Sequence, residues 1–155
     1  MLDPCQQDAP TLRGEHGVRL ALQAEGGDSE EIQVYKLDGC FDFPENMRRA
    51  DGLVIAKRDG KCWVIFVELT SGEGKGVDQL KETARYFCEN GHPWGRSDCP
   101  RDHSVLCVVV GGSRAEIPRR PVRLHGKNIR FYHHRPPRRS PLTLRKFLEQ
   151  LGVED

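Results

Sequence analysis

Two acidic residues, Asp51 and Glu68, have the most chemically informative spacing in this sequence of 155 residues. Glu68 interrupts the apolar run VIFVEL, and a carboxylate at the end of a buried strand is costly unless another group pairs with it. Between the two acids, Asp59-Gly60 predicts a tight hairpin turn that joins two strands. In that register Asp51 and Glu68 lie directly opposite each other, with Cβ atoms about 4.5–5.5 Å apart.

Facing carboxylates repel each other, and either a raised pKa or a shared divalent cation relieves the repulsion. A bound Mg²⁺ or Mn²⁺ would hold water beside a phosphate, and the glycine-rich loop SGEGKG leaves room for a ligand. Thr70 is expected on the same face of the sheet as the pair. Two alternatives stay open: Arg48 or Arg49 neutralises Asp51, or a one-residue slip puts the acids on opposite faces.

The elements that position this pair follow from the apolar patterns. Strands are predicted at residues 18–24, 32–37, 52–57, 61–69, 104–110 and 127–133. A helix is predicted at residues 77–89, and a last helix begins with Ser140 as N-cap and Pro141 at its first position. Residues 1–155 are therefore expected to form one α/β domain, a mixed central sheet flanked by helices, with residues 1–15 flexible.

The segments RADGLVIAK, VIFVELTSG and VDQLKETARYF resemble the core of the PD-(D/E)XK nuclease-like superfamily, which has the restriction-endonuclease-like fold. The superfamily pattern is an Asp on one strand, Glu-x-Lys on the next, and a helix that often carries a Gln. Asp51, Glu68 and Gln79 match these positions. The resemblance implies Mg²⁺ or Mn²⁺ ligated by Asp51, Glu68 and the Leu69 carbonyl, with Gln79 orienting water or a phosphate.

The sequence departs from this pattern at Thr70, which stands where the superfamily has its lysine. Losing a general-base or electrostatic group typically lowers a rate by ~10²–10⁴-fold. Lys75 in the glycine-rich loop is a candidate substitute. Two functions follow: a metal-dependent nuclease acting on nucleic-acid phosphodiesters, or a catalytically inactive module of the same fold that binds nucleic acid or protein.

Charge is unevenly spread along the chain. Residues 1–46 contain ten acidic and three basic residues, whereas residues 113–139, here called the basic segment, contain nine basic residues and one acidic residue. Such a segment is typical of a surface that binds DNA or RNA phosphates, although a solvated face or pairing with the acidic half is the simpler interpretation. The predicted nucleic-acid contacts are Arg119, Arg120, Arg123, Lys127, Arg130, Arg135, Arg138 and Arg139.

Cysteine and histidine form one further pattern. Cys88, His92, Cys99 and His103 have zinc-ligand chemistry, but their spacing matches no common zinc finger. Because Cys88 lies on the apolar stripe of its helix, a buried free cysteine is favoured over a zinc ligand. His133 and His134 are expected at the surface, at a strand end.

No apolar run approaches the ~18 residues that span a membrane, and the amino-terminal residues lack the apolar core of a signal peptide. We therefore expect a cytoplasmic protein without membrane association. In that compartment the six cysteines are expected to be thiols or metal ligands, with no disulfide. The sequence does not predict an oligomeric state.

Overall fold

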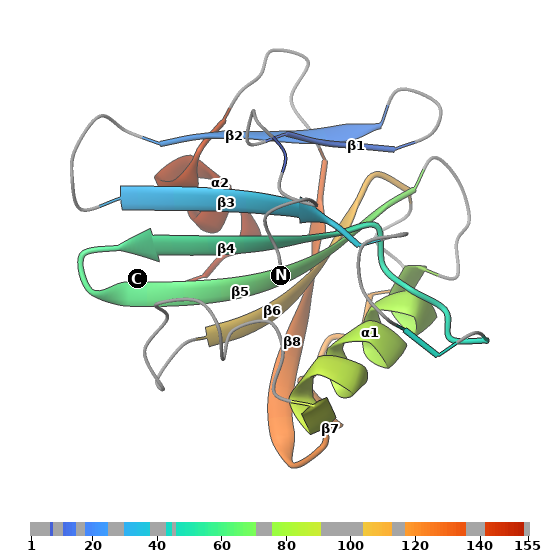
Figure 1. The fold of residues 1–155 in the computed structure, drawn as a ribbon. Coiled ribbons are helices and arrows are strands. Elements are labelled where there is room, and N and C mark those ends of the chain that lie inside the picture. Colours follow the sequence, from blue (N-terminus) through green and yellow to red (C-terminus); the bar gives the residue numbers. More distant parts are fainter. Residues whose placement is uncertain are drawn as a thin grey trace.

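The computed structural model describes residues 7, 11–14, 18–24, 30–37, 43–44, 46–70, 76–90, 104–112, 117–135 and 142–153. These residues form a single mixed α/β domain with two sheets and two helices (Figure 1). In this part of the chain no helix is both long and apolar enough to cross a membrane. The predicted α/β class is therefore confirmed.

The main sheet has six strands in the order β3-β4-β5-β6-β8-β7. Their bounds are Glu30–Lys36 (β3), Gly52–Arg58 (β4), Lys61–Leu69 (β5), Ser104–Val110 (β6), Val122–Leu124 (β7) and Lys127–His134 (β8). Neighbours β3, β4 and β5 are antiparallel, whereas β6 is parallel to β5 and β8 is parallel to β6. The carboxyl ends of β5, β6 and β8 therefore meet at one end of the sheet.

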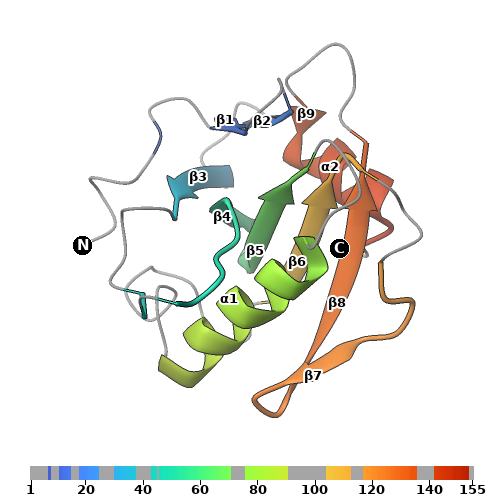
Figure 2. The ribbon, with the colours of Figure 1, turned by 90° about the vertical axis from the view of Figure 1, so that its right-hand side faces the viewer.

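A smaller sheet and two helices cover the main sheet. The smaller sheet has the order β1-β2-β9, from Thr11–Arg13 (β1), Arg19–Gln23 (β2) and Leu142–Thr143 (β9). Helix α1 is Gly76–Asn90 and helix α2 is Leu144–Leu151. Figure 2 shows α1 lying along one face of the main sheet, with the smaller sheet and α2 away from α1.

The alternation of side chains along β5 divides the core into two layers. Phe66 points toward α1, where its ring stacks on Phe87 with 5.5 Å between ring centroids. Its neighbour Ile65 points the other way and belongs to the cluster that contains Phe147 of α2. Burying one such side chain contributes about 1.5–3 kcal/mol. Glu68 is two residues beyond Phe66, so it projects from the face that α1 covers.

The hairpin that holds the acid pair has the predicted register. Asp59 and Gly60 form the turn with φ angles of 50° and 80°. Lys61 pairs with Arg58, and the register continues along both strands. The predicted bounds of β5 and β6 also agree with the structure.

Two predictions about the chain ends are wrong. Helix α2 begins at Leu144 rather than at Pro141, because its N-cap is Thr143 and not Ser140. The Thr143 side chain accepts the Lys146 N–H at 3.2 Å. Residues 1–15 are not flexible throughout, since Thr11–Arg13 pairs with β2 and Leu12 is buried in the core. The sequence pattern missed β1 because this strand is too short to show periodicity and buries only one leucine.

The prediction that no cysteine forms a disulfide is also wrong. Cys62 at the start of β5 is disulfide-bonded. Cys88 and Cys107, the other cysteines of the described residues, are free, so the partner of Cys62 lies outside the described residues. The prediction rested on the redox compartment, whereas the fold decides which two sulfurs come within bonding distance.

Titration of the denatured, unreduced protein with a thiol reagent is expected to find at most four of the six thiols. Reduction before denaturation should restore all six. A Cys62→Ser variant has one cysteine fewer, yet it should show one thiol more than the unreduced wild-type protein, because the former partner of Cys62 becomes free. Six thiols in the unreduced wild-type protein would contradict the disulfide.

Candidate functional site

Asp51 and Glu68 lie side by side where the β4–β5 hairpin ends. Gly52 pairs with Val67, so the next opposed pair along the hairpin is Asp51 with Glu68. The Asp51 N–H donates to Glu68 Oε1 at 3.1 Å, and the Leu69 N–H donates to Asp51 Oδ2 at 2.7 Å. The predicted juxtaposition is confirmed, and the alternative of a slipped register is wrong.

The environment of the pair keeps Glu68 protonated at neutral pH. Burial raises the pKa of Glu68 to about 9, and the charge of Asp51 and a side-chain hydrogen bond to it act in the same direction. In an unfolded chain the pKa of this group is near 4.5. Between pH 4.5 and about pH 9 the folded protein therefore keeps a proton on Glu68 that the unfolded chain has released. The free energy of unfolding consequently falls as pH rises from about 4.5 to about 9.

Arg48 does not neutralise Asp51. Its guanidinium pairs with Glu82 at 3.3 Å and with Asp78 at 3.7 Å, both on α1. Its backbone N–H also donates to Glu82 Oε2 at 2.8 Å. The guanidinium of Arg49 lies over the Phe43 ring, 5.3 Å from its centroid. The alternative in which Arg48 supplies the countercharge is therefore wrong.

Helix α1 is held beside the acid pair by one contact near its middle and one at its amino end. Thr83 Oγ1 accepts the Ala50 N–H at 2.7 Å, which ties the helix to the residue before Asp51. At Gly76, the first helical residue, an added Cβ would lie 3.0 Å from Glu68 Cγ. Glycine thus allows the helix to approach Glu68 closely. The partial positive charge of the helix amino end consequently lies near the carboxylates.

Of the other predicted catalytic residues, the structure describes Thr70 and Gln79. Thr70 directly follows β5, is half-buried, and its N–H donates to the Val110 carbonyl at 2.9 Å. Gln79 is half-buried in the first turn of α1, and its carbonyl accepts the Thr83 hydroxyl at 2.8 Å. Lys75 lies outside the described residues. The structure therefore brings Gln79 onto the helix end that contacts Glu68.

Two carboxyl groups suit Mg²⁺ or Mn²⁺ better than a cation whose ligands all come from the protein. Among the described residues no group of three or more His, Cys, Asp or Glu side chains could hold a metal ion. Mg²⁺ is commonly bound by one or two carboxylates and completes its shell with waters and substrate phosphates. The acid pair offers two carboxyl groups, the number that such a site uses.

The predicted zinc ligands are mostly outside the described residues, since only Cys88 of the four is described. Cys88 is a free, half-buried thiol on α1. Burial raises its pKa, which disfavours the thiolate that zinc requires. His92, Cys99 and His103 lie outside the described part of the chain.

The strand register extends the acid pair into a row across the sheet that reaches His133. Glu68 pairs with Val109, and Val109 pairs with His133. Laterally paired residues project from the same face, so His133 lies on the face of Glu68, two strands and about 9–10 Å away. The sequence offered only one signal for this residue, its position at the end of a predicted strand.

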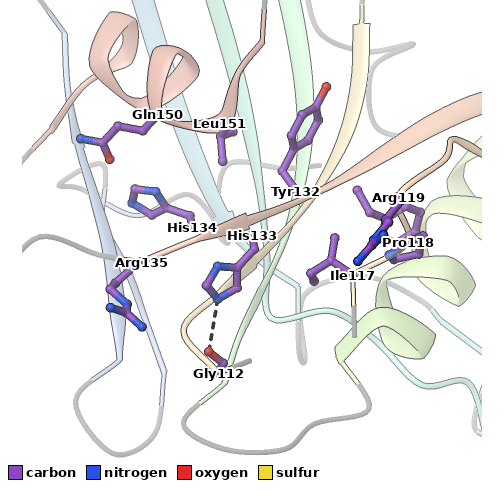
Figure 3. A pocket seen from close by; sticks show the side chains of 11 residues that line it. Gly112, Ile117, Pro118, Arg119, Tyr132, His133, His134, Arg135, Gln150 and Leu151 are labelled. Atoms are coloured by element: carbon purple, nitrogen blue, oxygen red, sulfur yellow. Dashed lines mark hydrogen bonds between the residues drawn. The ribbon is translucent and has the colours of Figure 1, made fainter. Parts of the chain in front are cut away.

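The His133 ring has a fixed orientation. Its Nε2 lies 3.0 Å from the Gly111 carbonyl oxygen and 3.2 Å from that of Gly112, so this nitrogen must donate (Figure 3). Nδ1 is therefore the nitrogen left for another partner. Gly111 has a φ of 84°, and a Cβ there would collide with the Thr70 carbonyl oxygen. Glycine at this position allows the bend that supports His133.

His134 differs from the sequence-based expectation, because it is buried and not at the surface. It is 2% exposed and packs edge-to-face on Phe147, with 5.0 Å between ring centroids. Burial lowers the pKa of His134 to about 4, and the adjacent His133 contributes. Its Nε2 has no hydrogen-bond partner among the described residues. The ring is therefore neutral at physiological pH.

A hollow of about 1160 Å³ opens beside the carboxyl-terminal half of β8. Its lining includes Tyr132 and His133 of β8, and Arg135 just after that strand (Figure 3). Arg119, which precedes β7, and Gln150 of α2 also line it. Residues of both faces of β8 line it, so the hollow extends around the outer edge of that strand.

The basic segment does not form one continuous face. Arg123 and Lys127 flank the β7–β8 turn, and six residues at ~3.3 Å each separate Lys127 from His133, about 20 Å. Arg119 and Arg135 instead line the hollow. The predicted nucleic-acid contacts that are described are all exposed: Arg119, Arg120, Arg123, Lys127, Arg130 and Arg135. Arg138 and Arg139 lie outside the described residues.

No protein-family model matches the sequence, and comparison with curated proteins and with solved structures finds no match. The geometry of the acid pair, the row that it begins and the hollow is therefore the basis for assigning a function.

Proposed function

We propose that this chain is a metal-dependent phosphodiesterase that cleaves nucleic acid. The observation that carries the proposal is the acid pair, in which Asp51 and Glu68 lie side by side and burial raises the pKa of Glu68 to about 9. Two acids forced together at a strand end destabilise the fold when both are ionised. Such strongly shifted pKa values cluster at functional sites.

The arrangement of the strands supports a restriction-endonuclease-like fold. Asp51 precedes β4, Glu68 lies in the antiparallel neighbour β5, and Gln79 lies in α1, which follows β5. The next strand, β6, returns parallel to β5. This order agrees with the superfamily pattern of an Asp strand, a Glu strand and a Gln helix.

Within this proposal each group has a defined task. Asp51 and Glu68 hold Mg²⁺ or Mn²⁺, with the Leu69 carbonyl as a further ligand. The ion, when bound, polarises a phosphoryl oxygen and lowers the pKa of water. Glu68 gives up its proton on metal binding, and Gln79 orients water or a phosphate oxygen. The amino end of α1 favours the negative charge of the phosphate.

A second candidate is a non-catalytic nucleic-acid or protein-binding module of the same fold. The observation that favours it is Thr70, which cannot supply the positive charge of the superfamily lysine. In this case the acid pair is a remnant of a catalytic ancestor, and the exposed arginines beside the hollow carry the function.

Mn²⁺ is expected to bind the protein with an affinity that rises by about tenfold per pH unit between pH 6 and 8, because each ion displaces the Glu68 proton. Calorimetry in two buffers of different ionisation enthalpy measures both the affinity and the proton release. Asp51→Asn should abolish binding. Asp78→Asn, which removes an exposed acid of α1 that pairs with Arg48, should leave it intact.

Two results would contradict this proposal. One is the absence of Mn²⁺ binding at pH 8. The other is binding with no proton release, which would place the ion away from Glu68.

A further inference from the structure

We propose that the hollow beside β8 binds a phosphate ester that carries an unpaired base, namely one nucleotide unit of a single-stranded nucleic acid. Its volume of about 1160 Å³ slightly exceeds that of typical ligand pockets, which measure about 300–1,000 Å³. A nucleotide therefore fits within it. Binding in the hollow does not depend on the proposed function; only the cleavage of the bound strand rests on it.

The charge of the lining selects an anion. Arg119 and Arg135 line the hollow, and none of its described lining residues is acidic. Both arginines are exposed, and neither forms an ion pair with a described residue. Arg48, in contrast, is engaged by two acids of α1. An exposed guanidinium beside a recess is suited to bidentate binding of a phosphate.

Uncharged hydrogen-bonding groups add to this lining. Because its Nε2 is committed to two carbonyl oxygens, His133 can offer Nδ1 to a ligand. Strand β7 pairs only with the first three residues of β8, ending at Ile129. From Arg130 onward, no strand of the described residues pairs with the outer edge of β8. Backbone groups of this edge are therefore a second source of hydrogen bonds.

The hollow also has apolar and aromatic walls that suit a base. Ile117, Pro118 and Phe131 line it together with Leu151 of α2. Tyr132 adds a half-buried ring, and burial raises its pKa, so the phenol stays neutral. Bases stack on such rings in proteins that bind single strands. A base in a duplex is already paired and stacked, so it cannot enter the recess without leaving the helix.

His133 connects this site to the acid pair. The residue lines the hollow and also ends the row that begins at Asp51 and Glu68. With about 9–10 Å between Glu68 and His133, a nucleotide in the hollow directs the neighbouring phosphate of its strand toward the acids. The substrate class that follows is single-stranded DNA or RNA, or the single-stranded end of a duplex.

The test is binding of a fluorescein-labelled oligothymidylate, measured by anisotropy without divalent metal. Arg119→Ala and Arg135→Ala should each weaken binding by about 5- to 10-fold and lower the salt dependence by about one phosphate contact. Arg123→Ala and Lys127→Ala are the matched controls, since they remove exposed cations that flank the β7–β8 turn and do not line the hollow. The controls should change affinity by less than about twofold.

Competition identifies the recognised unit. Thymidine monophosphate should displace the oligonucleotide at lower concentration than inorganic phosphate, and a duplex of the same length should bind more weakly than the single strand. Equal loss in all four variants, equal competition by phosphate, a duplex bound as tightly as the single strand, or no binding by the wild-type protein would each overturn the inference.

One variant separates this inference from the proposed function. Asp51→Asn should bind the oligonucleotide like the wild-type protein while losing cleavage. Binding in the hollow without cleavage by the wild-type protein would contradict the proposed function alone. Cleavage unaffected by Arg119→Ala and Arg135→Ala would contradict the hollow alone.

Discussion

Replacing Glu68 with glutamine is expected to abolish metal-dependent cleavage and, at the same time, to make the folded protein more stable above neutral pH. Glutamine keeps the shape of the side chain and its capacity to accept the Asp51 N–H. It cannot become a carboxylate, so the metal site loses a ligand. We expect a loss in rate of ~10²–10⁴-fold, the range for removal of a group that acts directly in the reaction.

The gain in stability has a separate physical cause. Above the unfolded pKa of 4.5 the wild-type fold must keep Glu68 protonated, which costs free energy that glutamine avoids. One pKa unit corresponds to about 1.4 kcal/mol, so a gain of at least that size is expected at pH 8. Chemical denaturation at pH 5 and pH 8 should show a smaller decrease of stability with pH in the variant than in the wild-type protein.

Glu82→Gln is the matched control for both effects. Glu82 is an acid on α1 that pairs with Arg48 and does not belong to the acid pair. Its replacement should leave cleavage and the pH dependence of stability unchanged. Cleavage by Glu68→Gln at the wild-type rate, or parallel pH profiles of the two proteins, would contradict the assigned role of Glu68.

Replacing Thr70 with lysine is expected to raise the rate of cleavage by ~10²-fold in the presence of Mg²⁺ or Mn²⁺, because a cation returns beside the phosphate. Thr70 is half-buried and ends β5 beside the acid pair, so a long side chain can follow the surface toward solvent. Single-turnover cleavage of single-stranded and double-stranded substrates measures the effect. Glu68→Ala in the same background should abolish the gained activity.

Lys75 decides between two outcomes of this experiment. If Lys75 already supplies the cation, Thr70→Lys will change little and Lys75→Ala will be the damaging substitution. If neither substitution alters cleavage of any substrate, the catalytic proposal is wrong. The binding module is then the function to test, through the hollow and its arginines.

The sequence by itself determined the acid pair. Asp59-Gly60 favours a two-residue turn, and a two-residue turn sets the pairing of every residue along both strands. The contact between Asp51 and Glu68 therefore follows from local rules, although the two residues are far apart in the chain. The bounds of β5 and β6 also followed from the sequence, because each is a largely apolar run between turn or loop residues.

Only the tertiary structure decided what surrounds the pair. His133 joins the row of Glu68 through two parallel pairings, β5 with β6 and β6 with β8, and parallel strands are joined by long connections that carry no register signal. The same pairings bury His134 and place the Arg135 end of β8 at the hollow, while leaving Lys127 at the far end of that strand. The disulfide of Cys62 likewise depends on which segments meet in space. Local backbone preferences set a hairpin register, whereas burial of both sheet faces sets the order of strands, and that order determines which side chains share a site.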